Sequence, residues 1–199
     1  MNINPDSASA HRPWSAVYPQ VGIAPDLPAS THHNLAHFIH DHCTRWARDS
    51  QAKAAFTCVV PNGMNGSLSF AQVDALSDAF AGYLRSTLGL ARGDRVAVQI
   101  AKSPEALALY AASVSIGAVF LPLNPAYTPP EVGYFLNDAT PRLFICDPAK
   151  ADALAEVASQ TTLKTLDAKG AGSFGADMAQ ADLQFVPEAR HGADLAAIL

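Results

Sequence analysis

The sequence predicts an α/β fold with a mainly parallel sheet and helices on both of its faces. Short apolar runs alternate with segments of helical periodicity along most of the chain, an alternation typical of βαβ units. The apolar run 118–123 has the composition of a central strand buried on both faces. Gly117 stands directly before this run and suits the left-handed end of a helix.

The first part of the chain predicts an extended arm, residues 1–30, rich in proline and small polar side chains. The rest, residues 31–199, is expected to form one α/β unit. Its first elements are expected to be a helix from Asn34, a strand at 53–60, a turn at 61–63, an extended segment at 67–70 and a helix that ends at Gly89.

The second part of the chain predicts a regular alternation of strands and helices. The expected elements are strands at 95–100, 118–123, 142–146 and 162–167, helices at 103–117, 129–139 and 149–159, a surface loop at 168–193 and a last strand at 194–199. Ser103 followed by Pro104 has the form of a helix start. Thr128, with a proline next and Glu131 three residues on, has the form of a capping box.

The composition indicates a globular chain and argues against several kinds of partner. Apolar residues make up 49% of the 199 residues and charged residues 16%, which fits a chain with a hydrophobic core. The net charge of −5 provides no basic patch, so we expect no nucleic acid as a partner. No apolar run approaches the length of a membrane span, and the first residues lack the pattern of a signal peptide.

The cysteines indicate a reducing compartment. Cys43, Cys58 and Cys146 are an odd number at unrelated spacings, and fit neither a zinc site nor a disulfide framework. Each lies in an apolar pattern, where a free cysteine packs as a small hydrophobic residue. We therefore expect a cytoplasmic location.

The residues themselves predict no catalytic, cofactor-binding or metal-binding site. The glycines at 170–175 follow no convincing strand and open no clear helix, so we expect a flexible loop there and not a phosphate cradle. His33 and His37 have the spacing for a metal on one helix face but lack carboxylate partners, which favours surface histidines. Asp94 and Asp147 lie at turns, where aspartate serves local hydrogen bonds.

Three segments in order resemble the acyl-adenylating, AMP-forming enzymes, which include acyl-CoA synthetases, nonribosomal peptide adenylation domains and luciferases. Residues 68–73 are similar to the first core motif of that family, residues 93–98 to the strand that follows it, and residues 114–131 to the second core motif. The resemblance implies that the chain is the N-terminal subdomain of the large domain of such an enzyme.

Shorter stretches resemble two branches of this family. Residues 102–110, 121–124 and 134–139 are most similar to malonyl-CoA synthetases, whereas the arm around Trp14 and Tyr18 is similar to bacterial fatty-acyl-CoA ligases. Residues 194–199 resemble the strand that leads into the family's phosphate loop. On this resemblance the phosphate loop, the acyl pocket, the magnesium-binding glutamate and the catalytic lysine would all lie beyond Leu199. The chain alone is then expected to be inactive and to bind no cofactor.

The resemblance implies that the parent enzyme uses ATP, Mg²⁺ and CoA. The carboxylate would attack the α-phosphate of ATP to give an acyl-adenylate and pyrophosphate, and the CoA thiol would then displace AMP. Malonate or another small carboxylic acid is the preferred substrate, and a fatty acid is the alternative. A self-contained, non-catalytic α/β binding module is a second alternative. An exposed edge at residues 194–199 would favour self-association.

Overall fold

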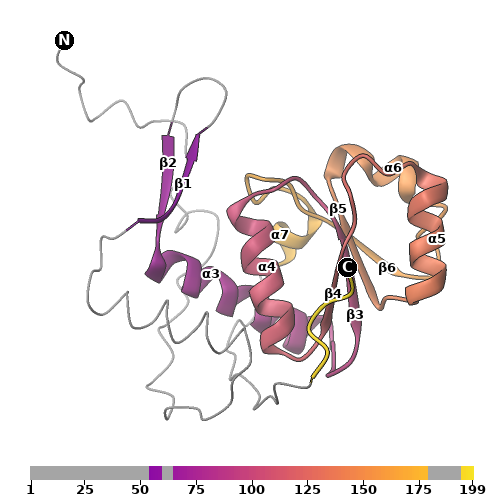
Figure 1. Cartoon of the computed structure of the whole chain (residues 1–199), viewed down its shortest axis with the longest axis horizontal. Helices are drawn as coiled ribbons and strands as arrows, with labels where there is room; N and C mark the ends of the chain where they lie inside the picture. Colours follow the sequence, from indigo (N-terminus) through magenta and orange to yellow (C-terminus); the bar gives the residue numbers. More distant parts are fainter. Residues whose placement is uncertain (1–53, 60–64, 179–193) are drawn as a thin grey trace.

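The computed structural model of the chain describes residues 54–59, 65–178 and 194–199, and confirms the α/β fold (Figure 1). The described strands form a two-stranded antiparallel sheet and a four-stranded parallel sheet. The predicted arm at 1–30, the predicted helix from Asn34, and His33 and His37 lie outside the described residues.

The antiparallel pair leads directly into the first described helix. β1 (Ala54–Val59) pairs with β2 (Asn65–Ser69), and α3 (Phe70–Gly82) begins at the next residue. α3 continues as a single π-helical segment, η1 (Tyr83–Thr87). Gly89, with a φ of 63°, follows this helix as predicted, because glycine adopts left-handed backbone conformations without strain.

The parallel sheet has the strand order β4-β3-β5-β6. Its strands are β3 (Arg95–Gln99), β4 (Val119–Pro122), β5 (Leu143–Cys146) and β6 (Thr162–Thr165). In register, Ala97 of β3 lies opposite Leu121 on one side and Phe144 on the other. The strand predicted at 118–123 is therefore an edge strand of this sheet, and the expectation that it would be central was wrong.

Residues 194–199 lie along the outer edge of β4 and provide hydrogen-bond partners for its backbone on that side. The N–H of Phe120 donates to the carbonyl oxygen of Ala196 at 3.0 Å, and the N–H of Ile198 donates to that of Phe120, also at 3.0 Å. Phe120 and Ala197 form a parallel bridge. β4 is consequently buried except at Pro122, although only one named strand pairs with it.

The helices that follow β3 are α4 (Pro104–Ser115), α5 (Pro129–Ala139), the 3₁₀ turn η2 (Pro148–Lys150), α6 (Ala151–Leu154) and α7 (Ser173–Met178). α4 and α5 begin where the sequence predicts. The Ser103 side chain accepts from the N–H of Ala106 at 3.2 Å, and Thr128 forms the predicted capping box with Glu131. Gly117 has a φ of 75°, as the predicted helix end requires.

Three predicted segments differ from the structure. The strand expected at 194–199 forms only an isolated bridge, between Ala197 and Phe120. The helix expected at 149–159 is only a 3₁₀ turn and the short α6, followed by turns. The segment 168–193, expected to be a surface loop, contains α7, whose Phe174 and Met178 are fully buried. The Phe174 ring meets those of Phe80 and Tyr83 edge-on, at 5.1 and 4.9 Å between centroids. These contacts with a distant helix, and not local propensity, place α7 in the core.

The core lies in two layers, one on each face of the parallel sheet (Figure 1). Val96 and Val98 belong to the layer that contains residues of α3, α4 and α7, whereas Ala97 belongs to the layer with residues of α5 and α6. This division follows from the alternation of side chains along β3. Within the described residues, no helix is long and apolar enough to cross a membrane.

Candidate functional site

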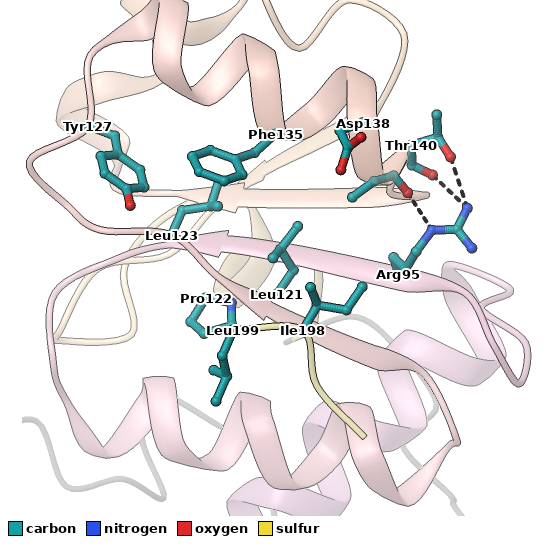
Figure 2. Close-up of a pocket in the computed structure, with 11 residues that line it drawn as sticks. Arg95, Leu121, Pro122, Leu123, Tyr127, Phe135, Asp138, Thr140, Ile198 and Leu199 are labelled. Carbon is teal, nitrogen blue, oxygen red and sulfur yellow. Dashed lines mark hydrogen bonds between the residues drawn. The ribbon is translucent and has the colours of Figure 1, made fainter. Parts of the chain in front are cut away.

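A recess of about 440 Å³ lies between α5, β4 and the segment 194–199 (Figure 2). Most of the side chains that line it are apolar. They are Leu121, Pro122, Leu123, Tyr127, Phe135, Ala139, Ile198 and Leu199, together with the polar residues Arg95, Asp138 and Thr140. A concave apolar surface with a few polar groups is the usual form of a binding site.

Two parts of the chain build the walls of the recess. The rings of Tyr127 and Phe135 are stacked, with 5.3 Å between centroids and 16° between planes. In Figure 2, Ile198 and Leu199 lie on the opposite side of Leu121 from Phe135. Ile198 is 37% exposed and Leu199 fully exposed, so the recess is bounded on that side by apolar side chains that face solvent.

Among the described residues, Arg95 is the one cation that lines the recess, and most of its donors are already used. Its Nε donates to the carbonyl oxygen of Ala139, and its Nη2 to the carbonyl oxygen and Oγ1 of Thr140, both at 3.0 Å. Its Nη1 lies 3.3 Å from the carbonyl oxygen of Gly93. Since the guanidinium carries five N–H donors in a fixed plane, little of it remains to bind a substrate carboxylate.

Gln99 is the buried polar residue at the carboxyl end of β3, the end of a parallel sheet where ligands commonly bind. Its Nε2 donates to the carbonyl oxygens of Asn124 and Tyr127, at 3.0 and 3.1 Å. Its Oε1 is buried and has no hydrogen-bond partner among the described residues. These bonds hold the loop after β4 against β3, and so position Tyr127 beside the recess.

Glu105 is buried on the other face of the sheet, in the first turn of α4. Its side chain is fully buried, and neither carboxylate oxygen has a hydrogen bond of normal geometry within the described part of the chain. Burial raises the pKa of this carboxyl to about 7, while its own N–H and Ser103 act in the opposite direction and the charge of Asp167 adds to the rise.

The glycine-rich turn before α7 was expected to be a flexible loop that follows no strand. It instead joins β6 to α7, and its N–H groups bind within the chain. Asp167 Oδ1 accepts from the N–H groups of Lys169 and Ala171, at 2.7 and 2.8 Å. Thr165 Oγ1 accepts from the N–H of Ser173 at 2.8 Å.

The glycine-rich turn before α7 does not have the form of a phosphate-binding loop. In the glycine-rich turn, the Asp167 carboxylate takes the place that a phosphate would need, and a Cβ at Gly172 would come within 2.2 Å of the Thr165 carbonyl oxygen. The glycine there serves close backbone packing. No cluster of three His, Cys, Asp or Glu side chains that could hold a metal ion occurs among the described residues.

The aspartates predicted to serve turns do so. Asp94 Oδ2 accepts from the N–H of Ala91 at 2.8 Å, and Asp147 Oδ1 from that of Ala149 at 2.8 Å. Sequence reasoning missed both Gln99 and Glu105. Glu105 was missed because a glutamate just after a helix start is normally exposed. The available signal was the nearly continuous apolar run that follows Glu105, which indicates a helix buried around most of its circumference.

Comparisons with known proteins agree with the fold and with the resemblance of the motifs. The family model described as AMP-binding enzyme matches residues 43–199. ATP-bound MatB from Rhodopseudomonas palustris is 38% identical over 79% of this chain and 32% of its own, with a TM-score of 0.63.

Two curated relatives are also similar to this chain. 4-Coumarate–CoA ligase 5 of Oryza sativa subsp. japonica is 30% identical over 82% of this chain and 29% of its own length. Long-chain-fatty-acid–CoA ligase FadD13 of Mycobacterium tuberculosis is 32% identical over 47% of this chain and 18% of its own. The chain therefore spans less than a third of the length of either curated relative.

Proposed function

Because this chain belongs to the AMP-binding enzyme family, we propose that it supplies the N-terminal α/β unit of an ATP-dependent acyl-CoA synthetase. That enzyme joins a carboxylic acid to the thiol of CoA, with AMP and pyrophosphate as the other products. Residues 31–199 make up the α/β unit, and residues 1–30 an extended arm. The cysteine pattern supports a cytoplasmic enzyme.

The observation that carries this proposal is the likeness to MatB, which combines 38% identity with a shared fold over 79% of the chain. The MatB structure contains bound ATP, which supports ATP as a substrate here. The CoA ligases among the curated relatives support the acid–thiol reaction.

Malonate or another small carboxylic acid is the proposed substrate. The support is the resemblance of residues 102–110, 121–124 and 134–139 to malonyl-CoA synthetases. A fatty acid is the second candidate, because FadD13, a long-chain-fatty-acid ligase by name, is 32% identical over 93 residues.

The chain's own contribution is structural. The glycine-rich turn does not have the form of a phosphate-binding loop, and the motifs that bind ATP and Mg²⁺ in the family that the chain resembles have no counterpart in residues 1–199, so we assign no catalytic, cofactor-binding or metal-binding role to the described residues. Other parts of the enzyme would bind ATP, Mg²⁺ and CoA. We expect the recess beside Tyr127 and Phe135 to receive apolar side chains from those parts. The 199-residue chain by itself is then inactive.

A chimera tests this proposal. Residues 1–199 replace the matching segment of MatB, and pyrophosphate release is measured with ATP, Mg²⁺, CoA and either malonate or a long-chain fatty acid. We expect malonate-dependent release from the chimera and none from the 199-residue chain or from the MatB remainder alone. A folded chimera without activity would instead favour a non-catalytic binding module, and release by the chain alone would contradict the assignment.

A further inference from the structure

The ion pair between Arg92 and Asp194 lies at the start of the segment 194–199, where that segment begins to follow β4. Arg92 Nη2 lies 2.5 Å from Asp194 Oδ1, and the two side chains are 58% and 22% exposed. Farther along, Ala197 forms the parallel bridge with Phe120, whose backbone makes both hydrogen bonds that join the described segment to β4. The ion pair and this backbone pairing are therefore the contacts that can set the position of the segment along β4.

The backbone pairing by itself also allows a second parallel register. A shift of the segment by two residues would place Leu195 beside Phe120. The carbonyl oxygen of Asp194 would then accept from Phe120, and the N–H of Ala196 would donate to it, so that both hydrogen bonds are kept and side chains face the same sides as before. The opposite shift is weaker in the 199-residue chain, because it would place Leu199 beside Phe120 and allow only one of the two bonds.

Burial of apolar side chains does not favour the observed register over the shifted one. Ala197 is partly buried against the core layer that contains residues of α3 and α4, whereas Leu195 is 61% exposed. Alternate residues of an extended segment share a side, so the shift would exchange this alanine for the leucine. A leucine at that place would remove more apolar surface from water than an alanine does.

The ion pair does distinguish the two registers. The shift moves each residue of the segment by about 6.6 Å along β4, which separates Asp194 from Arg92 as the two side chains lie in the structure. We propose that the pair of Arg92 and Asp194 is a register lock, which selects the observed position of residues 194–199 on β4 against the position two residues away. The lock is a property of this chain and does not depend on the function proposed above.

The register decides which side chains form one wall of the larger recess. Ile198 and Leu199 line that recess in the observed register. In the shifted register their places fall to Ala196 and Ala197, so the wall loses two large apolar side chains and the recess widens. Arg92 thereby shapes a recess that it does not line.

Thiol labelling of an Ala197→Cys variant of the 199-residue chain tests the lock. The introduced thiol is partly buried in the observed register, whereas the shift moves it to the place of Leu199, which is fully exposed. Labelling of the peptide that carries position 197, followed by mass spectrometry at low protein concentration, therefore reports the shifted population. We expect the added change Asp194→Asn to raise the labelling rate by about two- to fivefold, the range for an exposed ion pair.

Hydrogen exchange at the N–H of Phe120 separates a change of register from detachment of the segment. This N–H is bonded in both registers, so its protection should be the same with and without Asp194→Asn. A fall in its protection that matches the rise in labelling would overturn the register lock and show that the ion pair only clamps the segment down.

A double-mutant cycle shows whether the two charges act together. Arg92→Gln should raise labelling of the Ala197→Cys variant as much as Asp194→Asn does, and the two changes combined should raise it no further. Asp152→Asn, at an exposed position on α6, is the control and should leave the rate unchanged. Equal labelling with and without Asp194→Asn would contradict the proposal, as would effects of the two changes that multiply.

Discussion

The Nη2 atom of Arg95 lies 3.0 Å from both the carbonyl oxygen and the Oγ1 of Thr140, so that the first residue of β3 caps the end of α5. Thr140 has a φ of 43° and is the residue at which α5 ends. A helix end leaves carbonyl oxygens without partners inside the helix, and a cation placed there satisfies them. This contact joins α5, which packs on one face of the sheet, to the amino end of the inner strand β3.

We predict that Arg95→Met lowers the free energy of unfolding by about 1–3 kcal/mol, because the variant leaves the carbonyl oxygens of Ala139 and Thr140 without their charged donor. Urea denaturation measures this loss. Arg95→Lys should recover only a small part of it, since an ammonium group lacks the planar fork that reaches both carbonyls. An unchanged midpoint in Arg95→Met would show that water replaces the guanidinium at no cost.

Thr140→Asn should stabilise the chain by roughly 0.5–1 kcal/mol, because asparagine tolerates the left-handed conformation better than a β-branched residue. Its side-chain oxygen could still accept from Arg95. Thr140→Val is the matched control, since it keeps the branching and loses the hydroxyl, and should be less stable than the wild type. If asparagine proves no better than threonine, the left-handed conformation carries no strain at this position.

Val119→Asp should be severely destabilising, by roughly 3–5 kcal/mol, because it places a charge without a partner at a buried position of β4. Val119 is 4% exposed, and β4 is buried there even though it lies at the edge of the named strands. Asn124→Asp, at an exposed position just after β4, is the control and should change the thermal midpoint little. A Val119→Asp variant with the wild-type midpoint would mean that this position reaches solvent.

We predict that the 199-residue chain self-associates through apolar side chains that the described part of the structure leaves exposed. These are Tyr134, Leu195, Ile198 and Leu199. Three of them, Leu195, Ile198 and Leu199, lie on the segment along β4, and apolar side chains gathered on one exposed segment favour association. Light scattering should show a mass above that of a monomer, and Leu195→Glu with Leu199→Glu should lower it. A monodisperse monomer at high concentration would contradict this prediction.

Sequence reasoning succeeded where structure depends on neighbouring residues. Ser103 caps α4, Thr128 forms its box with Glu131, and Gly117 takes the left-handed conformation, because each interaction spans only a few residues. The apolar runs that form β3, β4 and β5 were also correctly predicted to be strands, since a strand covered on both faces needs apolar side chains throughout.

Tertiary structure alone decided which segments meet. β4 lies at the edge of the four-stranded sheet because β5 pairs with β3 on the other side. No single apolar run of the sequence specifies this strand order. Phe174 enters the core through its contacts with Phe80 and Tyr83, so a glycine-rich stretch contains a buried helix. Glu105 is fully buried in the first turn of α4, although a charged residue at that place in a helix is normally exposed. The sequence determined where most elements begin and end, whereas the pairing of distant elements determined which polar groups lost contact with water.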